Sequence, residues 1–276
     1  MLGRRGWNNV IFYVVVVAAT AVVLFPLYWM VTTSLKLPVE IYRKVALWPS
    51  TINLGNYAGI LADRGFLRSV GNSFVVSSSV TLLSLIVSAP AAYALTRYEF
   101  RGRRLMGRLV LFTYLTPVAL LFIPLSIIVS QLKLSDTLTG LIVVYIGLAV
   151  PLGTWMLQDH FRAVPREIEE QALLDGLGPL GVFVRIVVPL SAPGIAAVGI
   201  LMFTMSWNEL LLAMVLTNSD AAKTVPYALS SLIVGDSLPW GGLMAGACIA
   251  SAPLVIFYFV SQRFIAADLA SGAVKG

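Results

Sequence analysis

Six long apolar runs constrain the fold of this chain more than any other feature. A membrane-spanning helix needs about 20 predominantly apolar residues, and each run is close to that length. The runs lie at about residues 10–32, 70–95, 105–129, 141–157, 195–216 and 243–260. With 58% hydrophobic and 12% charged residues, the chain is also far more apolar than an ordinary soluble protein. The sequence therefore predicts an all-α, polytopic bundle of six transmembrane helices.

The connections between the runs do not look like independent domains, and no strong internal repeat is visible. The longest external connection, at about residues 34–68, has room for a short amphipathic helix. Prolines punctuate most of the apolar runs, which membrane helices tolerate when neighbouring helices satisfy the freed carbonyl groups. The first run is too long for the apolar core of a signal peptide, so we interpret it as an uncleaved span. We expect a single transmembrane domain over residues 1–276.

The distribution of Lys and Arg predicts the orientation of the bundle. With six spans, both termini lie on the same side of the membrane, and basic residues favour the cytoplasmic side. Twelve of the 19 basic residues fall on the side of the termini. The clearest signal is the stretch RYEFRGRR between the second and third runs. Both termini and this turn are therefore predicted to be cytoplasmic.

Several function classes are poorly supported by the composition. The chain has one cysteine, Cys248, and one histidine, His160, so a disulfide within the chain is impossible and a Cys- or His-based metal site or catalytic triad is disfavoured. No paired carboxylates lie inside the runs, which argues against an intramembrane enzyme. There is no G-x-x-x-x-G-K-[ST] sequence to hold ATP phosphates. We predict no catalytic, cofactor or metal site on this chain.

An acidic loop at about residues 161–194 interrupts this apolar sequence. Pro165 suits a first helical position, and Glu167, Glu169 and Glu170 follow where the helix dipole favours carboxylates. Gly176 or Gly178 can then take the left-handed conformation that ends a helix. A second helix is expected to start at Pro179 and to be limited by Pro189. These residues predict a short helix, a glycine turn and a second short helix.

An apolar stripe runs along the two predicted helices and needs a covering surface. It consists of Leu173, Leu177, Leu180, Val184 and Val187. Helices this short are marginal alone in water, so lipid, the bundle or a partner protein must cover the stripe. Helices that lie on lipid usually carry Lys and Arg on their polar face. The leading glutamates therefore favour a protein partner over the lipid surface.

The spacing within this loop resembles the EAA-x3-G-x9-I-x-LP motif of ABC-importer permeases. The matching residues are Glu170, Gln171, Ala172, Gly176, Ile186 and Pro189. Gln171 replaces an alanine and Val188 a leucine, while the spacing is intact. Four further stretches resemble the MalG-type permeases of carbohydrate importers: AAYALTRYEFRGRR, VPLGTWML, SWNEL and SGAVKG.

The resemblance implies a multi-pass permease subunit of the bacterial or archaeal cell (inner) membrane. This subunit would form half of a carbohydrate path and would not itself hydrolyse ATP. The resemblance also implies a second homologous permease, two ABC ATPase subunits that carry ATP and Mg, and an extracytoplasmic solute-binding protein. The loop would couple this chain to the ATPase through Glu169, Glu170, Gln171, Ala172, Asp175, Gly176, Ile186 and Pro189. The C-terminal tail would reach the same subunit through Ser271, Gly272, Lys275 and Gly276, although an ordinary frayed terminus is the alternative.

The stretch SWNEL places an acidic residue inside the fifth run. A carboxylate at the centre of a bilayer costs about 2.5–3.5 kcal/mol on insertion scales, so Glu209 is expected to face the bundle interior or a wet cavity. With Trp207 and Asn208 it could line the substrate path. The alternative is a structural hydrogen bond at the interface with the partner permease.

Two other functions remain open at this point. The chain could be an ABC permease for a solute other than a sugar. A secondary transporter is the weaker alternative, because such proteins usually show internal repeats or ion-coupling carboxylates near the membrane midplane.

Overall fold

The fold is helical throughout the part of the chain that the structure describes, and this part contains no strand. The structure is a computed structural model that describes residues 4–43, 45–233 and 238–273. It divides into two compact units, which are treated separately below. The first comprises Met1–Phe66 and Leu229–Ala252, and the second comprises Leu67–Ala228 and Pro253–Gly276.

The first unit contains α1 (Arg4–Ser34), α2 (Pro38–Arg43), α3 (Gly55–Ala62) and the beginning of α14 (Trp240–Ala273). Hydrogen bonds fold the segment after α1 back onto the end of that helix. The side-chain amide of Asn56 donates to the carbonyl oxygens of Ser34 and Lys36, at 2.9 and 3.0 Å. The hydroxyl groups of Ser34 and Tyr57 are 2.7 Å apart. The predicted short helix in this connection is thus present as two helices, α2 and α3.

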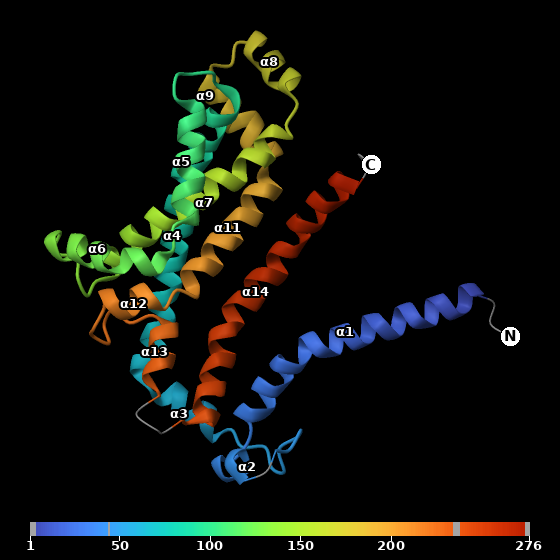
Figure 1. The fold of residues 1–276 in the computed structure, drawn as a ribbon, viewed down its shortest axis with the longest axis vertical. Coiled ribbons are helices and arrows are strands. Elements are labelled where there is room, and N and C mark those ends of the chain that lie inside the picture. The colour runs from blue at the N-terminus through green and yellow to red at the C-terminus, as the bar shows by residue number, and fades with distance from the viewer. Residues whose placement is uncertain (1–3, 44, 234–237, 274–276) are drawn as a thin grey trace. The chain divides into compact units, whose positions relative to one another are not determined.

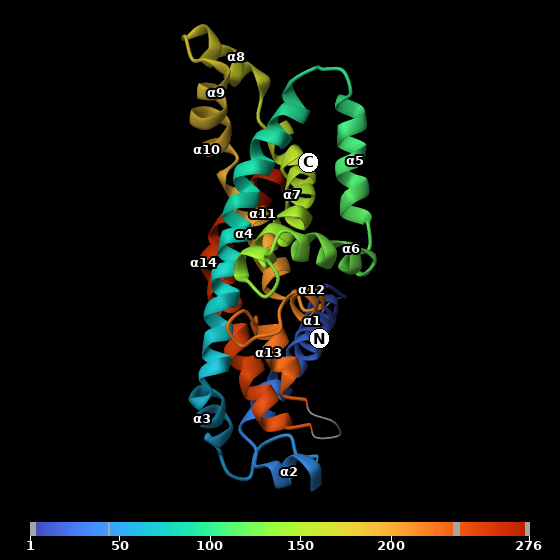
Figure 2. The same cartoon turned by 90° about the vertical axis from the view of Figure 1, so that its left-hand side faces the viewer.

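The second unit contains most of the long helices. They are α4 (Arg64–Arg97), α5 (Arg103–Leu115), α6 (Val118–Gln131), α7 (Leu138–Arg162), α11 (Ala192–Trp207) and α12 (Leu211–Leu216), with α13 (Val225–Ser231) shared with the first unit. Figures 1 and 2 show α7 running beside α5 and α11, against which it packs. The fully buried residues at the centre include Val80, Leu141, Leu157, Phe161 and Met202.

Small residues let these helices approach closely. Buried serines line one face of α4, at Ser69, Ser73, Ser77, Ser84 and Ser88. A Cβ atom added to Gly153 of α7 would lie 2.9 Å from the Ser88 hydroxyl oxygen and 1.9 Å from the terminal methyl group of Met202. Close packing through small residues is the usual way in which membrane helices associate.

Within the part of the chain that the structure describes, four helices are long and apolar enough to cross a membrane. They are Ile11–Ser34 within α1, Arg64–Arg97, Leu138–Arg162 and Trp240–Phe259 within α14. Two bent pairs raise the number to six if each pair counts as one span: α5 with α6, and Pro179–Leu190 with α11. This finding supports a multi-pass membrane protein. The observed helices also extend beyond the predicted bounds, most clearly in α14, which continues to Ala273 rather than ending near residue 260.

Two of the predicted spans are not continuous helices, which corrects the sequence-based interpretation. The third run, 105–129, bends by 96° between α5 and α6. Pro117 explains this bend, because a proline disfavours helical backbone in the residue before it, and Thr116 is extended at φ −69° and ψ 125°. The fifth run, 195–216, is interrupted between Trp207 and Leu211, where α11 ends and α12 begins.

A carboxylate joins the loop before α7 to the end of α12. The backbone N–H groups of Asn218 and Ser219 donate to Asp136 Oδ1 at 2.8 and 2.9 Å, and the N–H of Asp136 donates to the carbonyl oxygen of Leu216 at 2.8 Å. The two N–H donors hold the pKa of the Asp136 carboxyl below its usual value. Asp136 also has a positive φ of 58°, which Asp and Asn tolerate better than most residues.

We predict that Asp136 makes thermal stability depend on pH in the acidic range. A carboxyl whose pKa is lower in the folded state stabilises the protein fully above its unfolded pKa of about 4, and this stabilisation is lost as the pH falls through the lowered value. Asp136→Asn keeps an acceptor oxygen and the tolerance of positive φ but cannot ionise. The variant should have a lower Tm at pH 7 and lose less Tm between pH 7 and pH 3. Equal Tm losses for both proteins over this range would contradict the assignment.

Candidate functional site

The acidic loop after α7 has the predicted helix–turn–helix form. Its parts are α8 (Arg166–Leu174), α9 (Pro179–Val182), a five-residue π-helix (Phe183–Val187) and α10 (Val188–Leu190). Pro165 precedes α8 and does not occupy its first turn, whereas Pro179 starts α9 as expected. The order of the loop thus follows the sequence-based interpretation, with a shift of one residue at its start.

Gly176 forms the turn between the two helices because it adopts a left-handed conformation. Its φ is 91°, a value that costs glycine nothing and other residues strain. The N–H of Gly176 donates to the carbonyl oxygen of Leu173, and the N–H of Leu177 donates to that of Ala172, both at 3.1 Å. This pair of bonds is the Schellman arrangement that ends many helices. Of the two glycines proposed for this role, Gly176 therefore fills it, while Gly178 has a negative φ of −73°.

The second helix does not stop at Pro189 as expected. It continues to Leu190 through the π-helical turn, in which the N–H of Val188 donates to the carbonyl oxygen of Phe183. A proline lacks the N–H that an α-helix would use and clashes with the preceding turn. The wider π-turn ahead of Pro189 lets the chain remain helical until Ser191, where it turns into α11.

Glu169 is buried inside the second unit, where it pairs with Arg97 at the end of α4. Glu169 is only 7% exposed. A guanidinium nitrogen of Arg97 lies 2.6 Å from Glu169 Oε1, and the Tyr93 hydroxyl donates to Glu169 Oε2 at 2.8 Å. Every oxygen of this carboxylate thus has a partner in α4.

The same arginine also holds the end of α7. Arg97 donates to the backbone carbonyl oxygens of Phe161 and Val164, both at 2.7 Å. The last carbonyl groups of a helix have no partner within the helix, so Arg97 satisfies groups that burial would otherwise leave unpaired. One side chain therefore joins the ends of α4 and α7 to the beginning of α8.

Removal of either partner from a buried ion pair lowers the stability of the folded protein. A buried charge that loses its counter-ion typically costs about 3–5 kcal/mol, although the intact pair adds little over a well-packed apolar replacement. The Arg97–Glu169 pair is therefore best understood as a device that fixes the position of α8. It specifies where the loop lies more than it stabilises the fold.

The outer side of the loop carries exposed apolar residues next to an acidic group. Leu174 is 88% and Leu180 is 74% exposed, and Glu170, about one helical turn before Leu174 in α8, is also exposed. We call this surface the docking face; it consists of Glu170, Leu173, Leu174, Leu180 and Val184. Of the predicted apolar stripe, Val187 is buried in the bundle and Leu177 is half-buried, whereas the remaining three residues are exposed. Leu174 was not part of the predicted stripe.

The structure separates the residues that were predicted to couple the loop to an ATPase. Glu169 and Ala172 point into the second unit, and Ile186 is half-buried. Glu170, Gln171, Asp175, Gly176 and Pro189 are exposed. The sequence-based interpretation treated Glu169 and Glu170 as equivalent docking groups, and it missed Arg97 and Tyr93 altogether. Their signal was present in the stretch AAYALTRYEF, where Arg97 was counted only as a cytoplasmic charge.

The SWNEL stretch lies at the interruption between α11 and α12. Trp207 is buried and stacks on Phe203, with ring centroids 5.6 Å apart, whereas Asn208 is exposed. The carboxylate of Glu209 accepts hydrogen bonds from the N–H groups of Leu212 and Ala213, at 3.0 and 3.2 Å, and from the Tyr145 hydroxyl at 2.8 Å. It therefore caps the N-terminus of α12 and joins that helix to α7.

We predict that Glu209 acts through its hydrogen bonds. Glu209→Gln retains an acceptor oxygen, so its Tm should stay close to that of the wild type. Glu209→Ala leaves the Tyr145 hydroxyl and two N–H groups without their acceptor, at a cost of about 1–3 kcal/mol for each buried group, and should lower Tm clearly. The measurement is thermal unfolding of the purified complex beside solute uptake. Normal Tm with slow uptake in Glu209→Ala would instead place this carboxylate on the substrate path.

The structure describes only part of the predicted ATPase-contacting tail. Ser271 and Gly272 belong to the last turn of α14, which ends at Ala273. Lys275 and Gly276 lie outside the described residues. The expected contact of this tail with an ATPase therefore remains a prediction.

The sequence matches a family of membrane transport components. The model of the family described as "Binding-protein-dependent transport system inner membrane component" matches residues 81–271, which include both the Arg97–Glu169 pair and the docking face. The trehalose transport system permease protein SugB of Mycobacterium tuberculosis is 38% identical, covering 92% of this chain and 93% of the relative. The trehalose/maltose permease MalG of Thermococcus litoralis is 33% identical, covering 92% of each.

Solved transporter structures share the fold. A chain of a bacterial ABC transporter involved in import of the acidic polysaccharide alginate superposes with a TM-score of 0.79 at 22% identity, covering 95% of this chain and 98% of that one. A chain of the MetNI methionine ABC transporter gives a TM-score of 0.60 at 15% identity, covering 76% and 96%. At these identities the likeness concerns the fold alone.

Proposed function

We propose a function from the premise that this chain belongs to the family of binding-protein-dependent transport system inner membrane components. The chain is the transmembrane permease subunit of an ABC importer, and it transmits the power stroke of a separate ATPase through the α8–α9 loop. The importer takes up a carbohydrate. Relatives named for trehalose, for trehalose and maltose, and for diacetylchitobiose support this substrate class.

The docking face is the observation that carries this proposal. Exposed leucines at the tip of a loop between helices are costly in water, since each fully buried Leu side chain is worth about 1.5–3 kcal/mol relative to an exposed one. Their acidic neighbour Glu170 disfavours contact with anionic lipid. A protein groove with an apolar floor and a basic rim fits both features. The family supplies such a partner in the ATPase subunit.

Orientation follows from the basic residues near the loop. Within the second unit, α8 and α9 lie at the same end as the connection between α4 and α5 (Figure 1), which holds the RYEFRGRR stretch. Clustered arginines at the ends of membrane helices favour the cytoplasm. We therefore place this end, and both chain termini, on the cytoplasmic side of a six-span permease.

The proposed importer contains further subunits beside this permease. A second homologous permease forms the other half of the translocation path, and two ATPase subunits with ATP and Mg bind on the cytoplasmic side. An external solute-binding protein delivers the sugar. Similarity to the alginate transporter solved with a pentasaccharide-bound periplasmic protein, with a TM-score of 0.71 at 12% identity, supports a fold suited to such an assembly.

We predict that the docking face binds the ATPase without contributing to the fold. The double variant Glu170→Lys, Leu174→Ser changes only exposed side chains, so the Tm of the permease should stay unchanged. The amount of ATPase that co-purifies with it should fall at least fivefold, because the variant loses both apolar contact and charge complementarity. The control is Asp220→Lys, which reverses a charge in an exposed connection outside the loop.

The test is co-purification of the ATPase subunit from detergent-solubilised membranes, with ATP hydrolysis as the second readout. Full recovery of ATPase by the double variant at both low and high salt would contradict the assigned docking face. A loss of ATPase in the Asp220→Lys control as well would show that recovery depends on overall charge and not on this loop.

A further inference from the structure

A partly enclosed cavity of the first unit has the chemistry of a sugar-binding site. It measures about 280 Å³ and lies between the end of α1, α2 and the beginning of α14. Its lining comprises Trp29, Thr33, Lys36, Ile41, Tyr42, Val45, Trp240 and Met244. Small-molecule sites are typically apolar and aromatic cavities that hold a few placed polar groups. The volume is at the lower end for such sites, which suits one sugar ring better than a long oligosaccharide.

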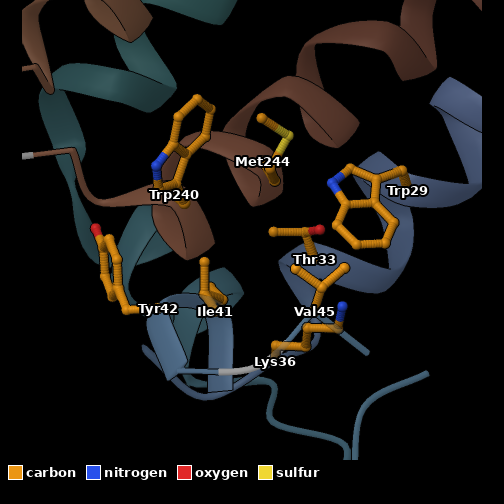
Figure 3. A pocket seen from close by; sticks show the side chains of 8 residues that line it. All are labelled: Trp29, Thr33, Lys36, Ile41, Tyr42, Val45, Trp240 and Met244. Atoms are coloured by element: carbon orange, nitrogen blue, oxygen red, sulfur yellow. The ribbon is translucent and has the colours of Figure 1, made fainter. Parts of the chain in front are cut away.

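Aromatic rings form two sides of this cavity. Trp29 and Trp240 lie on opposite sides, and Thr33 projects between them (Figure 3). The Tyr42 hydroxyl donates to the carbonyl oxygen of Leu238, which fixes that ring at the edge of the cavity. Among the described residues, neither indole N–H has a hydrogen-bond acceptor. The Trp29 ring already stacks on Phe25, with ring centroids 6.1 Å apart, so Trp240 offers the flat apolar face, and the two indoles offer two unused donors.

The Thr33 hydroxyl is a second feature of this cavity that suits a ligand. Thr33 is 5% exposed, and its oxygen is one of seven buried side-chain oxygens without a hydrogen-bond partner within the described residues. Of these seven, it alone belongs to a residue that lines the cavity. An unpaired buried hydroxyl costs about 1–3 kcal/mol, and most buried polar side-chain atoms are paired. A hydroxyl group of a bound molecule would pair with it.

Lys36 contributes a buried ammonium group with unused hydrogen-bond donors. The residue is 3% exposed, and its ammonium group lies 4.4 Å from the centre of the Trp29 ring and 2.5 Å from the carbonyl oxygen of Ala46. No carboxylate among the described residues forms an ion pair with it. An ammonium group has three donors, so at least one N–H remains for the oxygens of a ligand.

We infer that this cavity binds one ring of a saccharide. The ring stacks its C–H face on Trp240, while its hydroxyl groups pair with Thr33 and Lys36. Flat apolar faces next to hydrogen-bonding groups complement a sugar better than a lipid chain, which would leave the buried polar groups unpaired. The inference rests on the proposed carbohydrate substrate. It adds a binding site at the end of the first span and in the segment that follows it, which the proposed orientation places on the external side.

The experiment uses the complete transporter in lipid nanodiscs without its binding protein. Whole-cell uptake of radiolabelled trehalose, maltose and diacetylchitobiose first identifies a transported sugar. Equilibrium dialysis then measures the binding of that sugar to the nanodisc complex. Trp240→Leu, which removes the stacking surface, should weaken binding at least fivefold. Trp48→Leu is the matched control, because Trp48 is exposed in the same unit and does not line the cavity.

Thr33→Val keeps this test independent of folding. The change is nearly isosteric and removes a hydroxyl that has no partner among the described residues, so the sugar-free complex should be as stable as the wild type or more stable. Binding should nevertheless weaken two- to tenfold. A transported sugar whose binding is the same in wild type, Trp240→Leu and Thr33→Val would overturn the cavity assignment and leave the proposed function intact. Failure of the wild type to take up any of the three sugars would contradict both the carbohydrate class and the saccharide in this cavity.

Discussion

The ion pair between Arg97 and Glu169 is the contact on which the position of the α8–α9 loop depends. Its two partners are 72 residues apart in sequence, and Arg97 also satisfies the carbonyl groups at the end of α7. A loop that needed no fixed position relative to the bundle could be stabilised by its own helix caps alone. A loop with the proposed coupling role must keep a fixed position relative to the helices of its own subunit, and a charge pair buried among three helix ends provides this. The position of the docking face is in this view a consequence of the contact between α8 and α4.

This arrangement gives the two adjacent glutamates different roles. Successive residues in a helix are about 100° apart, because 3.6 residues make one turn. Glu169 therefore points to α4 while Glu170 stays exposed. One carboxylate holds the loop, and the other remains available to the proposed ATPase partner. A substitution that replaces both residues would mix loss of loop position with loss of docking, which is why the two positions need separate variants.

The elements whose conformation is set by neighbouring residues could be predicted from the sequence. The elements whose conformation is set by residues far apart in the sequence could not. The turn at Gly176 was predictable because glycine alone takes a left-handed φ without strain, and the apolar runs were predictable from length and hydrophobicity. The bend at Pro117 had a local signal that the long apolar run concealed.

The burial of Glu169 depends on Arg97, a partner that spacing along the loop does not reveal. The interruption before α12 likewise depends on Tyr145 and on backbone groups that Glu209 reaches only in the folded state. The unpaired hydroxyl of Thr33 is visible only once its surroundings are known.

A double-mutant cycle on Arg97 and Glu169 tests the central claim most directly. The cycle comprises Arg97→Met, Glu169→Leu and the double variant, with the free energy of unfolding measured by denaturant titration in detergent. We predict that each single change costs about 3–5 kcal/mol, because it leaves a buried charge unpaired, and that the double variant costs much less than the sum of the two. Additive costs, or single variants as stable as the wild type, would show that this pair does not hold the loop in place.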